Sequence, residues 1–509
     1  MNNISENNKR IAKNTILLYI RMFFIMAVSL YTSRVILNAL GIEDYGIFNV
    51  VGGIVSMMGM FNSAMSSSTT RYLTFELGKN DNTQLTKTFS ISLSIYYIVA
   101  IIFLLLSETI GLWFLNTKLI IPDARLLAAN WVFQFTIFSV ISMLFINPYN
   151  ACIIAHEEMG IFAYISIFEV LLKLFIVYLL GFTNHDHLIV YGFLYMLSSF
   201  SILFIYVIYC HRHYKECTFK YYHDLSLFSE IVKYSGWNLF GSVAGFVRGQ
   251  GLNILINMFF NPAVNAARGI AYQVNTAVTQ FINNFYTAAK PQITKYYAQN
   301  DIENMNKLVF RSSKLSFFLM LILSLPIVIE APYIIKLWLG QLPEYVVPFV
   351  RIIIIISAID GLASPLMTVA HATGRIALYQ SLVGSLQILN IPISYFLLYS
   401  GNGPLVVFYV SAIIAIICLF TRLWICNYLC SFPFGRYSLD VILRSILVCI
   451  MALFLPIYLH LILPESFMSV ICVTVASIVC SLLSFLIIGL NKQEREIVFK
   501  ISKNKLYRS

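Results

Sequence analysis

Long apolar segments constrain the fold of this chain more than any other feature of its sequence. A helix needs about 20 consecutive apolar residues to cross a bilayer, and the sequence contains about 14 segments of that kind. Hydrophobic residues make up 59% of the 509 positions, and charged residues only 11%. A soluble core could not bury so much apolar surface. The sequence therefore predicts an all-α polytopic membrane protein with about 14 transmembrane helices.

Six apolar segments of the first half recur in the second half at one offset, which predicts an internal repeat. The first series lies near 15–38, 46–70, 88–114, 124–151, 160–182 and 188–210, and the second near 235–260, 264–289, 308–331, 345–372, 378–400 and 404–428. Four residues also match at a shift of 220 positions, namely Thr74 with Thr294, Asn80 with Asn300, Asp81 with Asp301 and Lys87 with Lys307. Four identical residues alone would be weak evidence for a repeat, but a constant offset over six apolar segments is stronger evidence.

The repeat predicts how the chain is divided. We expect two pseudo-symmetric six-helix bundles, a polar connector between them, two additional transmembrane helices and a basic tail. The expected boundaries are 1–210 for the N-terminal bundle, 211–233 for the connector, 234–430 for the C-terminal bundle, 431–490 for the two helices and 491–509 for the tail.

Lysines and arginines are distributed unevenly between the loops on the two sides of the expected membrane. The loops on the side opposite the termini carry little more than Lys118, Arg125, Arg268 and Lys336. Because positively charged loops stay in the cytoplasm, we expect both termini and the connector to face the cytoplasm. The net charge of +11 then reflects membrane topology, and no nucleic-acid partner is expected.

Motifs for catalysis, metals or nucleotides are missing from the sequence. It contains no G-x-x-x-x-G-K-[ST] loop for ATP and no zinc, serine or cysteine catalytic set. Several cysteines, Cys152 and Cys418 among them, fall in or beside apolar segments, where a cysteine is a small packing residue. The run His185-Asp186-His187 has no further ligands near it in sequence. We therefore expect no enzyme, no cofactor and no metal.

Arg248 is the most deeply placed arginine of the sequence. It lies roughly 20 Å along its helix from the cytoplasmic start, too deep to reach water easily. Gly245 and Gly249 beside it leave space for a neighbour. We expect Arg248 to face a water-filled cavity, and the alternative is a salt bridge to Asp360 or Glu169.

Acidic residues within the apolar segments are candidates for ion coupling. Asp360 lies near the middle of its segment, where an acid either binds a proton or cation or pairs with an arginine. Glu169 and Lys173 are four residues apart, which places them on one helical face as a structural or functional ion pair.

Three short stretches carry a resemblance to a known family: S-R-V at 33–35, L-G-I-E-D-Y-G at 40–46 and V-V-G-G at 50–53. In these stretches the chain resembles the polysaccharide and O-antigen flippases, a family of the multidrug/oligosaccharidyl-lipid/polysaccharide (MOP) exporter superfamily. That superfamily also contains the multidrug and toxic-compound extrusion (MATE) transporters. The resemblance implies a MATE-like fold and a place in the bacterial inner membrane.

The resemblance also implies a function and a site. The expected function is alternating-access transfer of an undecaprenyl-diphosphate-linked oligosaccharide to the outer leaflet, for O-antigen, lipopolysaccharide or capsule biosynthesis. In the family, the first, second, seventh and eighth spans line a central cleft, which would place Arg34, Arg248 and Arg268 around the substrate. The implied partners are this lipid-linked substrate, membrane lipids, H+ or Na+ as coupling ion, and the polysaccharide polymerase machinery.

Two other functions fit the sequence less well. A multidrug or organic-cation antiporter of the same fold should have a cavity rich in acids, yet arginines outnumber Asp360 and Glu169 in the apolar segments. A membrane polysaccharide polymerase or ligase should carry a large outer loop, and the repeat leaves no room for one.

The topology can be tested by labelling single cysteines in a cysteine-free background. A cysteine at position 79 should react only with a reagent applied from the cytoplasmic side, and one at position 118 only with a reagent applied from outside. Labelling of both positions from outside would contradict the topology.

Overall fold

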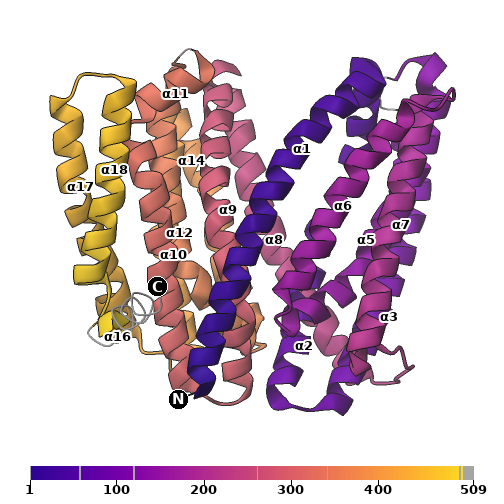
Figure 1. Ribbon diagram of the computed structural model, residues 1–509, viewed down its shortest axis with the longest axis horizontal. Coiled ribbons are helices and arrows are strands. Elements are labelled where there is room, and N and C mark those ends of the chain that lie inside the picture. The colour runs from indigo at the N-terminus through magenta and orange to yellow at the C-terminus, as the bar shows by residue number, and fades with distance from the viewer. Residues whose placement is uncertain are drawn as a thin grey trace, which may run out of the picture. The chain divides into compact units, whose positions relative to one another are not determined.

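The computed structural model describes residues 2–56, 59–117, 121–260, 262–340, 342–491 and 494–496, and these residues form helices and loops without any strand (Figure 1). The all-helical class predicted from the sequence is confirmed. In chain order the elements are α1 (Asn2–Ser56), α2 (Gly59–Lys79), α3 (Asn82–Leu106), η1 (Ser107–Gly111), α4 (Leu112–Thr117), α5 (Asp123–Ala155), α6 (Met159–Leu180), α7 (His187–His213), η2 (Lys215–Cys217), α8 (Leu225–Phe259), α9 (Pro262–Ala298), α10 (Ile302–Ile329), α11 (Ala331–Leu339), α12 (Val346–Ala372), α13 (Ile376–Ile388), α14 (Asn390–Tyr399), α15 (Leu405–Cys430), α16 (Phe434–Tyr437), η3 (Ser438–Leu443), α17 (Arg444–Ile462), α18 (Phe467–Ser484) and η4 (Phe485–Gly489).

Within the described ranges, 12 helical segments are long and apolar enough to cross a membrane. The two other segments expected to span, near 46–70 and 264–289, are also helical where they are described, and they fall within α1, α2 and α9. The segment near 46–70 is divided at residues 57 and 58, which lie outside the described residues, and the segment near 264–289 is rich in amides and other polar residues. The chain is a multi-pass membrane protein.

Internal contacts divide the chain into two compact units. Unit 1 comprises Met1–Ser242 and Thr294–Asn300, and unit 2 comprises Val243–Ile293 and Asp301–Ser509. Helix α8 therefore begins in unit 1 and ends in unit 2, and the last turn of α9 belongs to unit 1.

In unit 1, helix α5 is the central packing element. It packs against α7 and α2, while α1 runs along α6 (Figure 1). Val132 and Phe133 of α5 are buried in one apolar cluster with Phe103 of α3. Gly192 of α7 allows a close approach, because a Cβ there would lie 3.2 Å from side-chain atoms of Phe135 and Val132. The close packing of α5 and α7 thus requires glycine at this position.

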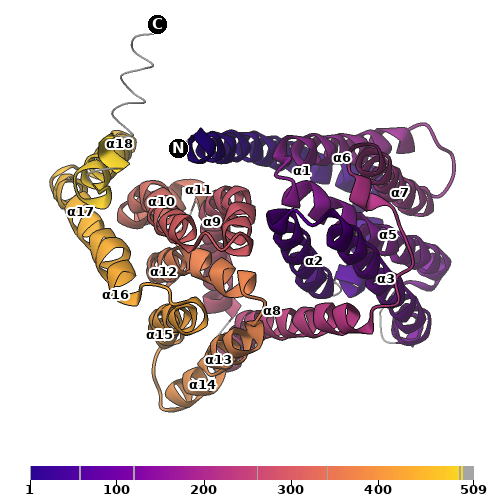
Figure 2. The same ribbon diagram turned by 90° about the horizontal axis from the view of Figure 1, so that it is seen from below.

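In unit 2, helix α12 packs against α15 and α10, and buries Phe349 and Ile353 in the main apolar core. Helices α17 and α18 lie side by side (Figure 2), and α18 also packs against α10. The helix after α12 is interrupted between α13 and α14, where Asn390 donates a hydrogen bond of 2.8 Å to the hydroxyl of Ser411. This buried contact ties the break to α15.

The residues that match at the repeat have the same local role in the two loops. Asn80 and Asn300 adopt left-handed backbone conformations with φ of 59° and 56°, a region that asparagine tolerates better than most residues. The next residue caps the following helix in each case. Asp81 accepts a hydrogen bond of 2.9 Å from the amide of Gln84, and Asp301 one of 3.2 Å from the amide of Asn304. The repeat therefore has a structural basis in a shared turn.

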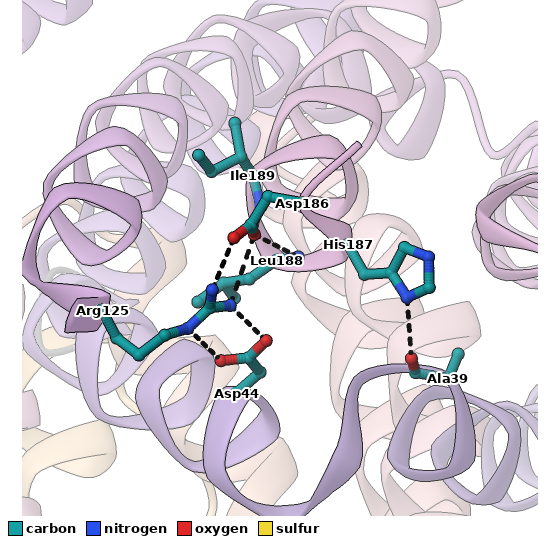
Figure 3. Close-up of polar contacts among 7 residues, drawn as sticks. All are labelled: Ala39, Asp44, Arg125, Asp186, His187, Leu188 and Ile189. Atoms are coloured by element: carbon teal, nitrogen blue, oxygen red, sulfur yellow. Dashed lines mark hydrogen bonds and ion pairs between the residues drawn. The ribbon is translucent and has the colours of Figure 1, made fainter. Parts of the chain in front are cut away.

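Arg125 ties three helices of unit 1 together at the start of α5 (Figure 3). Its Nε donates to Asp44 Oδ1 of α1 at 2.8 Å, and its Nη1 donates to Asp186 Oδ2 at the start of α7 at 2.5 Å. Asp44 follows a break in α1 at Gly41, whose φ of 77° favours glycine. The L-G-I-E-D-Y-G stretch thus supplies both a turn and an anchoring carboxylate.

The second carboxylate of this network also caps a helix. Asp186 accepts hydrogen bonds from the amides of Leu188 at 3.0 Å and Ile189 at 3.2 Å, the first turn of α7. Burial would raise the pKa of Asp186, but the hydrogen bonds from Arg125 and from these amides outweigh burial and hold that pKa below its ordinary value. Asp186 therefore stays ionised at neutral pH.

Candidate functional site

Arg248 lies in the part of α8 that belongs to unit 2, with its side chain half-buried. It forms no ion pair with any carboxylate of the described residues. A Cβ built at Gly245 would meet only the amide oxygen of Gln387, at 3.7 Å, and one built at Gly249 would meet nothing within 4 Å. The space expected beside Arg248 is therefore present.

Asp360 has a partner that the sequence reasoning missed. Nη1 of Arg422, on α15, lies 3.3 Å from Oδ1 of Asp360 on α12. The Arg422 side chain is only 10% exposed, while that of Asp360 is 37% exposed. Asp360 is thus not a lone acid, and its pairing with an arginine was the alternative that the sequence left open.

Two arginines and Asp360 act electrostatically on one residue of α15. Cys418 is influenced by Arg422, by Asp360 and, least of the three, by Arg248. Asp360 contacts Arg422 alone of the two arginines, so the positive charge of Arg248 is not cancelled by it. An uncompensated charge inside a membrane protein is costly and marks a candidate site for an ion or a charged substrate.

Hydroxyl groups continue this polar region along α12. Tyr286 of α9 donates a hydrogen bond of 2.6 Å to the carbonyl oxygen of Ser364 and also contacts the Thr368 hydroxyl. The Ser364 hydroxyl in turn donates to the carbonyl oxygen of Asp360 at 2.9 Å. Polar groups of α9, α12 and α15 thus meet in the interior of unit 2.

Arg268 is held within unit 2 at the start of α9. Its Nη2 donates to the carbonyl oxygen of Gly249 at 2.7 Å and its Nη1 to Asn253 Oδ1 at 3.1 Å, both on α8. Its guanidinium carbon also lies 4.6 Å from the ring centroid of Tyr272. Because these partners are neutral, its positive charge is oriented but not cancelled. The side chain of Arg34, the third predicted cation, lies outside the described residues.

Several amide side chains of α8 and α9 are exposed. They are those of Gln250, Asn257, Gln280 and Asn283. Asn253, by contrast, is used within the protein as an acceptor for Arg268.

Unit 1 contains the predicted pair of Glu169 and Lys173. The Lys173 Nζ lies 2.6 Å from Glu169 Oε1 on the same face of α6. Lys173 also lies 5.1 Å from the ring centroid of Tyr195, and Arg21 interacts electrostatically with Glu169. The pair is therefore part of a wider polar group that again contains more cations than acids.

Comparison with known proteins identifies the fold but not a family. No protein-family model matches the sequence, and no curated protein matches it. An outward-facing multidrug resistance MATE transporter of the MOP superfamily is similar in structure, with a TM-score of 0.71, 12% identity, and coverage of 84% of this chain and 97% of that chain.

Two further solved structures show the same likeness. A MOP superfamily transporter from Pyrococcus furiosus, described as having a binding pocket of reverse polarity that suggests a different function, has a TM-score of 0.67 at 13% identity, covering 82% of this chain and 96% of that one. A MATE transporter in complex with Rb+ has a TM-score of 0.64 at 15% identity, covering 84% and 97%. All three are transporters, and the chain has the fold of MATE transporters.

The pair of Asp360 and Arg422 should show strong energetic coupling. Asp360→Asn leaves the buried guanidinium without an anion and should lower the free energy of unfolding by about 3 kcal/mol. Arg422→Met should cost less, because Asp360 can take up a proton whereas arginine cannot lose one. The double variant should recover most of the loss, as measured by unfolding of the purified protein in detergent.

The matched control is the exposed pair of Glu303 and Lys307, whose side chains are 80% and 53% exposed. Removing that pair should change stability by less than about 0.5 kcal/mol. Strictly additive effects of Asp360→Asn and Arg422→Met would contradict the coupling.

Proposed function

We propose that this protein is a flippase that transfers an undecaprenyl-diphosphate-linked oligosaccharide from the cytoplasmic to the outer leaflet of the bacterial inner membrane. One observation carries the proposal: the guanidinium of Arg248 has no described carboxylate as its partner, and Asp360, the acid on α12 of the same unit, is already paired with Arg422. A site with surplus positive charge suits an anionic head group and disfavours an organic cation.

The chemistry of a lipid diphosphate fits this site. A guanidinium presents planar, paired N–H donors that match phosphate oxygens, and such charge-assisted hydrogen bonds are stronger in a poorly hydrated interior. The exposed amides of Gln250 and Asn257 on α8, and of Gln280 and Asn283 on α9, would bind sugar hydroxyls. Arg268, fixed by Gly249 and Asn253, would be a further cation on the substrate's path.

A multidrug antiporter, the alternative function, is consistent with the fold but fits less well with the surplus of arginines inside unit 2. The solved structures with this fold include a multidrug resistance transporter and a transporter described as having a pocket of reverse polarity. Charge in the site, rather than fold, must therefore decide between cationic and anionic substrates. The surplus of arginine favours an anion.

Asp360 is the residue that we propose for ion coupling. When Asp360 takes up a proton, Arg422 loses its counterion and becomes available to the diphosphate. Binding of the anionic substrate and of the proton would then favour each other. The double variant Asp360→Asn/Arg422→Met, in which the pair is absent, should transport at a rate that no longer responds to an imposed pH gradient.

Replacement of Arg248 tests the proposal in cells. Loss of a charge-assisted contact costs about 2–3 kcal/mol, so Arg248→Ala should lower transport about 30- to 150-fold. Surface polysaccharide should fall accordingly at a normal protein level, with the lipid-linked intermediate accumulating on the cytoplasmic face. Arg248→Lys should restore only part of the activity, because lysine lacks the paired donors.

The control is Arg375→Ala, which removes an exposed arginine between α12 and α13 and should leave export unchanged. A purely structural role predicts a different pattern. Arg248→Ala would then reduce protein level and thermal stability, and the protein that does fold would transport at the normal rate. Normal transport by the folded Arg248→Ala protein would reject the proposed role of Arg248.

A further inference from the structure

Cysteine, histidine and glutamate side chains gather at one end of unit 1, where α5, α7 and η2 meet. Cys152 lies in the last turn of α5 and His156 directly follows that helix, while Glu216 and Cys217 are adjacent in η2. Cys210, near the end of α7, lies close to Cys217. The three cysteines are at most 1% exposed, whereas the His156 side chain is 27% exposed. The cluster is buried but accessible on the histidine side.

The possible ligand atoms of this cluster lie close together. Those of Cys152, His156 and Glu216 are all within 4.8 Å of one another. Cys152 Sγ lies 3.5 Å from Glu216 Oε1 and 3.5 Å from Cys217 Sγ. Nε2 of His156 lies 2.5 Å from the same Glu216 oxygen. The ligand atoms of Cys152, His156 and Glu216 thus converge on one small volume, and the Cys217 sulfur lies beside that of Cys152.

These separations are close to those of a tetrahedral zinc site. Zinc bonds of about 2.3 Å to sulfur and about 2.0 Å to nitrogen or oxygen place neighbouring ligand atoms about 3.3–3.8 Å apart. The two separations that involve Cys152 Sγ already lie in that range. To complete the site, the contact of His156 with Glu216 must open and the Cys217 sulfur must turn toward them, both by side-chain rotation.

We propose that Cys152, His156, Glu216 and Cys217 form a binding site for Zn2+. The two sulfurs, Nε2 of His156 and one oxygen of Glu216 would complete four-coordinate geometry, which is typical of structural rather than catalytic zinc. On binding, each cysteine releases its thiol proton and the sulfur lone pair forms the bond to the metal. Cys210 would remain outside the coordination sphere, with its thiol donating to the carbonyl oxygen of Tyr149 at 3.6 Å.

The surroundings of the cluster support this assignment. His156 stacks on Tyr214 with ring centroids 4.3 Å apart, which fixes the orientation of the imidazole. The Glu216 carboxylate already accepts a hydrogen bond from the Cys152 thiol, so its oxygen faces the sulfur with which it would share the metal.

A metal at this position would join α5 to the segment that follows α7. That segment leads to α8 through residues 218–224, which are not helical. Without a metal, only the hydrogen bonds of the cluster and the neighbouring apolar contacts hold η2 against α5. Zinc would therefore act as a structural clamp within unit 1.

Metal analysis of the full-length purified protein tests the proposal. After equilibration with buffered Zn2+ and removal of free metal, the protein should retain about one zinc per chain. Cys152→Ser and His156→Gln should each weaken zinc affinity by more than the roughly 100-fold that loss of an outer-shell group can cost. Cys418→Ser, which changes a buried cysteine of unit 2, should retain full binding. A chelator should lower the unfolding temperature of the wild type and of Cys418→Ser, but not of His156→Gln.

Because Cys152→Ser alters a buried residue and could impair folding, the partly exposed His156 provides the independent test. Zinc content that is unchanged in His156→Gln would overturn the proposal, as would wild-type protein that retains no zinc. A disulfide between Cys152 and Cys217 in protein that contains no zinc would also overturn it and identify the pair as redox-active instead.

Discussion

Charged side chains inside apolar helices need partners, because an isolated charge in a poorly hydrated interior costs several kcal/mol. The polar interior of this protein is arranged around that constraint. Asp360 pairs with Arg422, and Glu169 pairs with Lys173. Arg268 orients its guanidinium with neutral acceptors, whereas Arg248 has no described carboxylate as partner. The remaining positive charge is what an anionic substrate would compensate, and the proposed function rests on it.

Features set by local spacing could be predicted from the sequence. Apolar segments of sufficient length form helices, since only a helix satisfies its own backbone groups in a bilayer. Glu169 and Lys173 meet because side chains four residues apart share a helical face. The matched residues Asn80 and Asn300 have the same left-handed conformation, since each occupies the same position in its turn. In these cases neighbours along the chain determine the structure.

Pairs from different helices could not be predicted in this way. Arg422 is 62 residues from Asp360, and Glu216 is 64 residues from Cys152. Whether such residues meet depends on the rotation and depth of each helix, which segment boundaries do not specify. In the sequence, Arg125 is notable only as one of the few cations in the loops opposite the termini. In the structure it binds Asp44, which is 81 residues away along the chain. The carboxylate of the motif that carried the family resemblance thus has a structural role.

Transport by the purified protein in liposomes tests the central claim most directly. A fluorescent undecaprenyl-diphosphate-linked oligosaccharide is placed in both leaflets, and its accessibility to an enzyme or quencher added outside is followed over time. The account predicts that the protein makes the inner-leaflet pool accessible, and that liposomes without protein, or with Arg248→Ala, do so far more slowly. Transport of a cationic dye instead, with no movement of the lipid-linked oligosaccharide and no effect of Arg248→Ala, would contradict the account.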